Sequence, residues 1–200
     1  MGGRWPTWVF SNHDQPRIRT RLGGSEERAR AALLMVLTLR GTPFLYAGEE
    51  LGLEDAVVPP ERMVDPGGRD GCRAPIPWTR DDDHGWLAEP WLPWPPEPSQ
   101  RSVEAQRAEP SSFLHLARGL LEARRASAAL RTGTLRLLNG APDEVLAYER
   151  AAGEDRRRVW VNFGPDAAAL PSEWVADLRT DDGDAGAPLD VDTAAILRPR

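Results

Sequence analysis

The chain has 200 residues, 40% of them hydrophobic, and a formal net charge of −6, which fits one large domain or two small ones and lacks the basic stripe that a nucleic-acid partner requires. A single cysteine, Cys72, excludes an intrachain disulfide and favours a reducing, cytoplasmic location. The N-terminus carries no long apolar run that would serve as a signal peptide or membrane span, so no membrane partner is expected.

The first third of the chain predicts a strand, a helix and a second strand. Residues Trp5–Phe10 form an apolar run that is typical of a buried strand. Ser25–Arg40 has apolar residues at helical spacing, a serine that can cap the helix and Gly41 to end it. Thr42–Ala47 is a second short strand. This order and spacing predict a βαβ unit with parallel strands.

A proline-rich stretch interrupts the regular pattern between Pro59 and Pro110 and predicts a long loop. Loops of this length in compact proteins are usually functional. Ser111 or Ser112 then caps a helix that runs to about Ala126.

The periodicity changes after Gly133 from helical to alternating. We predict a small antiparallel β domain there, and we place the boundary near Leu130, which gives domains at 1–130 and 131–200. The expected strands are Thr134–Leu138, Val145–Glu149, Arg158–Phe163 and Ala194–Arg198.

Polar residues follow the first strand abruptly, at Asn12-His13-Asp14. The carboxyl ends of parallel strands are where enzymes place chemistry, so the pair His13 and Asp14 is a candidate for hydrogen bonding to sugar hydroxyls. The alternative is a turn, because Asn and Asp bond their own backbone, and the tripeptide alone favours it. Arg17 is either a partner for a carboxylate or a solvated arginine.

Other polar clusters have competing structural explanations. One of Glu49 and Glu50 can point into a pocket, but holding a loop or capping a helix is favoured for at least one. The charged segment Arg69–Arg73 either lines a pocket rim or ties down the long loop. Cys72 is better explained as a small buried thiol than as a nucleophile.

Two features of the long loop suggest binding without requiring it. His84 ends the run Asp81–His84, which resembles a metal-ligand pattern, but without a second cluster a solvated acidic loop is favoured, and we expect no metal and no cofactor. The tryptophans of this loop are expected mainly to pack it onto the body, with stacking on sugar rings as the alternative.

Several ordered motifs together resemble a known family. The segments are Phe10–Arg17, Arg40–Leu53, Asp65-Pro66 and Arg69–Pro75, in that order. They resemble the alpha-amylase superfamily of glycoside hydrolases (glycoside hydrolase family 13), in its alpha-glucosidase and oligo-1,6-glucosidase branch. The helix that begins at Ser112 resembles the last barrel helix of that family.

The resemblance implies an α/β plus all-β fold, in which a (β/α)8 TIM barrel precedes an antiparallel β-sandwich. On that template the chain is expected to begin at the seventh barrel strand. It would then hold strands seven and eight with their helices, the long eighth loop and the C-terminal β domain.

The resemblance also implies roles for individual residues. Asp14 resembles the carboxylate that stabilises the transition state, and His13 resembles its hydrogen-bonding neighbour. Arg17 resembles the arginine that closes the pocket around a terminal glucose. Arg69 and Arg73 lie in the loop that resembles the one beside the leaving-group sugar.

A retaining glycosidase also needs a nucleophile and an acid/base carboxylate. The resemblance places both on barrel strands that would precede this sequence. We therefore expect part of a retaining alpha-glucosidase for short α-glucosyl oligosaccharides, inactive alone, whose partner is the missing N-terminal half of the barrel. The alternatives are a glucosyl transferase or isomerase such as trehalose synthase, and a non-catalytic carbohydrate-binding or assembly protein.

Overall fold

A computed structural model describes residues 4–200, which group into two compact units. One unit comprises the N-terminal residues up to Trp8, Arg30–Pro43 and Leu116–Arg200, and the other comprises Val9–Ala29 and Phe44–His115. The division into domains at 1–130 and 131–200 stays a prediction. Within the described residues, no helix combines the length and the apolarity that crossing a membrane requires.

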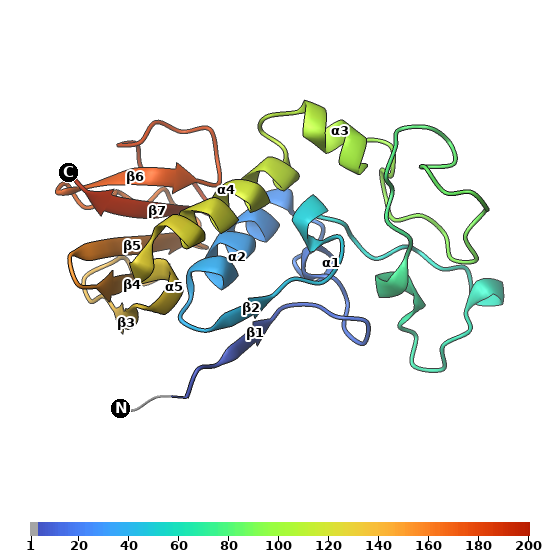
Figure 1. Cartoon of the computed structure of the whole chain (residues 1–200), viewed down its shortest axis with the longest axis horizontal. Helices are drawn as coiled ribbons and strands as arrows, with labels where there is room; N and C mark the ends of the chain where they lie inside the picture. The colour runs from blue at the N-terminus through green and yellow to red at the C-terminus, as the bar shows by residue number, and fades with distance from the viewer. Residues whose placement is uncertain (1–3) are drawn as a thin grey trace. The chain divides into compact units, whose positions relative to one another are not determined.

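The strand–helix–strand order predicted for the first third is present, with shorter strands. Strands β1 (Thr7–Val9) and β2 (Thr42–Phe44) pair in a two-stranded sheet, and their arrows point the same way in Figure 1. Helix α2 (Glu26–Thr38) lies between them in sequence. It begins where predicted, because the Ser25 hydroxyl accepts the N–H of Arg28 at 3.1 Å.

The proline-rich stretch is a long loop, as predicted, with short helical turns inside it. Two 3₁₀ turns lie within it, at Pro60–Arg62 and Asp70–Arg73, and another precedes it at Glu49–Leu51. Helix α3 (Val103–Ala108) was not predicted, and it is capped by the Ser102 hydroxyl. The four-residue helix α1 (Ile18–Arg21) was not predicted either, because a single turn is too short to show a helical repeat of apolar residues.

The helix predicted from Ser112 to about Ala126 is α4 (Phe113–Ala126). Its cap is Ser112, whose hydroxyl accepts the N–H of His115 at 3.3 Å. A second serine, Ser127, accepts the N–H of Leu130 at 3.2 Å and starts the separate short helix α5 (Ala128–Thr132).

The C-terminal part forms one antiparallel sheet of five strands in the order β3-β4-β5-β7-β6 (Figure 1). Four of the strands were predicted and β6 was missed, because a register irregularity between Ala176 and Leu178 interrupts its alternation. The described strands form this single sheet in place of the expected two-sheet sandwich. The bounds are β3 Thr134–Leu137, β4 Val145–Ala152, β5 Asp155–Asn162, β6 Trp174–Arg179 and β7 Thr193–Pro199.

Both faces of the sheet are covered within this unit. One face carries an apolar cluster built around Trp160 and Trp174. The other face meets the helices, where the Tyr148 hydroxyl lies 2.6 Å from Thr38 Oγ1 and α5 contacts β4 and β5. At Gly119 of α4 a Cβ would lie 3.4 Å from Leu178, so the helix passes close to β6. The other buried members of the apolar cluster are Val145, Ala147, Ala168, Leu189, Ala195 and Leu197.

Candidate functional site

A tight turn follows β1 and exposes two of the predicted site residues. The N–H of Gln15 donates to the Asn12 carbonyl at 3.3 Å, and the N–H of Asp14 donates to Asn12 Oδ1 at 2.8 Å. The turn interpretation is therefore confirmed. The turn also presents side chains, since His13 is 70% and Asp14 46% exposed. A turn and a binding role are thus compatible at this position.

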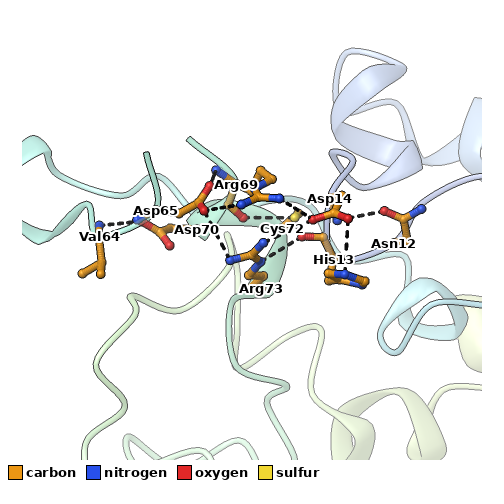
Figure 2. Close-up of polar contacts among 9 residues, drawn as sticks. All are labelled: Asn12, His13, Asp14, Val64, Asp65, Arg69, Asp70, Cys72 and Arg73. Atoms are coloured by element: carbon orange, nitrogen blue, oxygen red, sulfur yellow. Dashed lines mark hydrogen bonds and ion pairs between the residues drawn. The ribbon is translucent and has the colours of Figure 1, made fainter. Parts of the chain in front are cut away.

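Asp14 lies between two arginine side chains and His13 (Figure 2). Its Oδ1 accepts from Arg69 Nη1 at 2.6 Å and lies 3.4 Å from Arg73 Nη2. Its Oδ2 lies 3.3 Å from His13 Nε2. The structure therefore brings together four of the five predicted site residues: His13, Asp14, Arg69 and Arg73.

Asp65 anchors both arginines from the other side. Arg69 donates two parallel hydrogen bonds to the Asp65 carboxylate, from Nε to Oδ2 at 2.8 Å and from Nη2 to Oδ1 at 2.5 Å. Arg73 lies 3.8 Å from the same carboxylate, and its Nε donates to the His13 carbonyl at 2.8 Å. The interpretation that the segment Arg69–Arg73 ties the loop down is therefore confirmed, and its guanidinium groups also reach Asp14. Its place on a pocket rim stays a prediction.

The Arg69–Asp65 pair shifts the protonation equilibria of both groups. Hydrogen bonds from Arg69 hold the pKa of the Asp65 carboxyl well below its usual range, and those to Asp65 raise the pKa of Arg69. Asp65 belongs to the motif Asp65-Pro66, but the sequence alone did not predict it as a site residue. A carboxylate four residues before an arginine was the available signal.

Asp65→Asn is expected to flatten the acid dependence of stability. The pKa of Asp65 is lower in the folded state than in the unfolded state, where it is about 4. The ionised carboxylate therefore contributes to the free energy of unfolding at pH values above the unfolded pKa, and this contribution is lost as the pH falls toward the folded pKa. The variant should melt at lower temperature at neutral pH and lose less stability on acidification. Thermal unfolding from neutral pH to about pH 2 measures this, with the exposed Glu61→Gln as control. A wild-type slope in Asp65→Asn would contradict the expectation.

The loop that carries the arginines is fixed by buried groups. Asp70 Oδ2 accepts the N–H groups of Val64 at 2.8 Å and Asp65 at 3.0 Å. The Cys72 thiol is buried and lies 3.0 Å from the Arg69 carbonyl, and burial raises its pKa. At Gly71 a Cβ would lie 2.6 Å from the Ala56 carbonyl oxygen. The expectation that Cys72 is a small buried thiol is confirmed, and Asp70 is a structural residue that sequence reasoning did not single out.

Arg17 lies apart from this group and is 2% exposed. Its guanidinium donates to the Ala47 carbonyl at 2.7 Å and lies 4.9 Å from the centre of the Tyr46 ring. Burial lowers its pKa. At Gly48, where φ is +92°, a Cβ would lie 2.7 Å from Arg17 Nη1, which requires glycine. The solvated-arginine interpretation is wrong, and the closing of a glucose pocket by Arg17 stays a prediction.

Glu49 and Glu50 hold the chain after β2, as favoured from the sequence. Glu49 is 5% exposed, accepts the Ser11 hydroxyl and accepts the Tyr46 N–H at 2.8 Å. Glu50 accepts the Gly48 N–H at 2.8 Å. Burial raises the pKa of Glu49.

Glu49→Gln is expected to keep the stability of the chain, whereas Glu49→Ala should lower it by about 2 kcal/mol. The amide retains the shape and can bond both Ser11 and the Tyr46 N–H, while alanine leaves them unsatisfied. Urea unfolding of the two variants measures the difference. Equal losses in both would show that the charge of Glu49, and not its hydrogen bonding, supports the fold.

His84 differs from its expected place in a solvated acidic loop. Its side chain is buried, its Nδ1 lies 3.2 Å from the Thr79 carbonyl, and its ring packs edge-on against Trp94. In residues 4–200 no group of three or more His, Cys, Asp or Glu side chains has the arrangement of a metal site.

The chain is similar to known carbohydrate-active proteins. A model of the alpha-amylase catalytic domain matches residues 1–133. A probable alpha-glucosidase of Rhizobium meliloti (strain 1021) is 35% identical over 191 residues, which cover 88% of this chain and 34% of that protein. An oligo-1,6-glucosidase of Parageobacillus thermoglucosidasius is 27% identical over 194 residues, 81% of this chain and 34% of that protein.

A solved structure has a similar fold. The alpha-glucosyl transfer enzyme XgtA aligns with a TM-score of 0.80 and 33% identity, over 97% of this chain and 40% of that one. The chain spans about a third of the length of the curated relatives that it matches.

Proposed function

Because the chain belongs to the alpha-amylase family, we propose that it supplies part of the substrate pocket of a retaining alpha-glucosidase for short α-glucosyl oligosaccharides. In this proposal β1 and β2 are the seventh and eighth strands of the barrel, and the enzyme is cytoplasmic. The turn after β1 and the loop Asp65–Arg73 together form one wall of the pocket.

The convergence of two arginines on the half-exposed Asp14 is the observation that carries this proposal. Arg69 and Arg73 fix the direction of a carboxylate whose side chain is still 46% exposed. Such a carboxylate accepts hydroxyl hydrogen bonds from a sugar and stabilises the positive charge of an oxocarbenium-like transition state. His13 lies beside it as a second hydrogen-bonding group.

We further propose that the 200 residues alone do not hydrolyse glycosides. A retaining mechanism needs two carboxyl groups about 5 Å apart across the scissile bond. The other carboxylates near the turn already accept hydrogen bonds within the protein. Asp65 accepts from Arg69. Glu49 accepts from the Ser11 hydroxyl and the Tyr46 N–H, and Glu50 accepts from the Gly48 N–H. The nucleophile and the acid/base would come from the N-terminal part of a barrel.

An assay with p-nitrophenyl α-glucoside tests the proposal. The purified chain should give no turnover, and co-expression with the N-terminal two thirds of the Rhizobium meliloti relative should restore it. Turnover by the chain alone that disappears in Asp14→Ala would overturn the requirement for a partner. Full activity of the reassembled enzyme after Asp14→Ala would overturn the role of Asp14.

Glucosyl transfer is the second candidate activity, and the likeness to XgtA favours it. Both reactions use the same pocket and differ in whether water or a sugar hydroxyl attacks the intermediate. Incubating the reassembled enzyme with maltose separates them. Hydrolysis yields glucose alone, whereas transfer also yields a new trisaccharide.

A further inference from the structure

A second part of the long loop, Trp78–Trp94, is folded onto itself independently of the Asp14 turn. The N–H of Trp78 donates to the His84 carbonyl at 2.9 Å, and the N–H of His84 donates to the Asp81 carbonyl at 2.9 Å. The N–H of Trp86 donates to the Asp83 carbonyl at 3.0 Å. These bonds fix the segment between Trp78 and Trp86 as a closed, ordered loop.

Two indole rings in this loop are held in place by the groups around them. The buried His84 ring packs edge-on against Trp94, with 4.5 Å between centroids. Trp94 in turn meets Trp86 at 6.0 Å with an interplanar angle of 80°. Trp86 Nε1 donates to the Ile76 carbonyl at 2.9 Å, which fixes its ring. The aromatic surface is therefore ordered before any ligand arrives, which lowers the entropic cost of binding.

A cavity of about 410 Å³ lies against these rings. Its polar side chains are three carboxylates, those of Asp82, Asp83 and Glu89, and the described lining contains no cationic side chain. An apolar, partly aromatic wall with a few acceptors on one side is the usual composition of a small-molecule site. The remaining lining residues are Trp86, Leu87, Ala88, Pro90 and Trp94.

We propose that this cavity is a second carbohydrate-binding site, which takes one glucosyl ring of an α-glucan. The apolar face of the pyranose would lie on an indole, and the carboxylates would accept hydrogen bonds from its hydroxyls. The site shares no residue with the Asp14 turn and goes beyond the proposed hydrolytic function. It would hold a glucan chain on the protein without taking part in the reaction.

The contacts of the two indoles favour a sugar over an organic cation. A cation-binding cage surrounds its ligand with several open ring faces. Trp94 is half-buried and is engaged by both His84 and Trp86 in edge-to-face contacts, which leaves Trp86, 39% exposed, as the more accessible indole. One accessible ring face suits the flat apolar side of a pyranose better than it suits a quaternary ammonium group.

Calorimetric titration of the whole chain with maltotriose tests this proposal. Trp86→Ala should weaken binding roughly tenfold, equivalent to about 1.4 kcal/mol. The double variant Asp82→Asn/Glu89→Gln changes exposed carboxylates and should also weaken it. Trp91→Ala, an exposed tryptophan outside the cavity, and Glu61→Gln, an exposed carboxylate outside it, should bind within about twofold of the wild type.

Three outcomes would overturn the proposal. They are no saturable binding by the wild-type chain, loss of binding in Asp14→Asn with full binding in Trp86→Ala, and competitive displacement of maltotriose by tetramethylammonium. Near-ultraviolet circular dichroism establishes whether Trp86→Ala is folded. If it is not, the double carboxamide variant decides: wild-type affinity overturns the proposal and weakened affinity supports it.

Discussion

Asp14→Asn is expected to lower kcat/KM of the reassembled enzyme by roughly 10²–10³-fold, the usual effect of removing one group that stabilises charge in a transition state. The amide keeps the size of the carboxylate and can still accept the bond from Arg69. It has no negative charge to stabilise an oxocarbenium-like sugar. Most of the loss should appear in kcat, because the charge develops only in the transition state.

The local structure should survive this substitution. Arg69 keeps its two bonds to Asp65, and Arg73 keeps its bond to the His13 carbonyl. The midpoint of urea unfolding should therefore change little, which separates a loss of chemistry from a loss of fold. Glu61→Gln removes one exposed charge from the same loop and serves as the matched control. If Asp14→Asn retained more than about a tenth of the activity, Asp14 would have no such role.

Arg150→Met is expected to lower the free energy of unfolding by about 3 kcal/mol, the largest effect on stability that we predict. Arg150 is fully buried on β4 and donates to the carbonyls of Gly133 and Thr134, each at 3.1 Å, and of Thr38. Burial lowers its pKa to about 10, so the guanidinium keeps its charge at neutral pH. Methionine fills much of the space but leaves these carbonyl oxygens without that donor.

Urea unfolding measures this effect, and the midpoint should fall while the slope stays unchanged. Arg136→Met is the matched control, because Arg136 is an arginine of the adjacent strand with a 63% exposed side chain. Its effect should stay within about 0.5 kcal/mol. Arg150→Lys should be intermediate, since an ammonium cannot bond three separated carbonyls as the planar fork does. A wild-type midpoint for Arg150→Met would show that the three bonds contribute nothing net.

The sequence predicted the helices and strands whose capping residues or alternating apolar residues lie close together along the chain. Ser25 and Ser112 begin helices where their side chains can cap the first turn, and most strands of the C-terminal sheet follow from alternation. Helix α5 and strand β6 were among the elements that were missed. Ser127 starts the separate helix α5 directly after α4, where its hydroxyl both caps the helix and donates to Asp155, 28 positions away in sequence, and β6 has a register irregularity that breaks its alternation.

The amino-acid sequence by itself determined the family, the order of the main elements and the residue types of the site. Only the tertiary structure decided that Asp14 meets Arg69 across 55 positions of sequence, and that Arg17 is buried beside Tyr46. Backbone propensities and capping act between neighbours along the chain, so a sequence pattern reveals them. Ion pairs between distant loops and the burial of a charge depend on how those loops pack, and no local pattern contains that information.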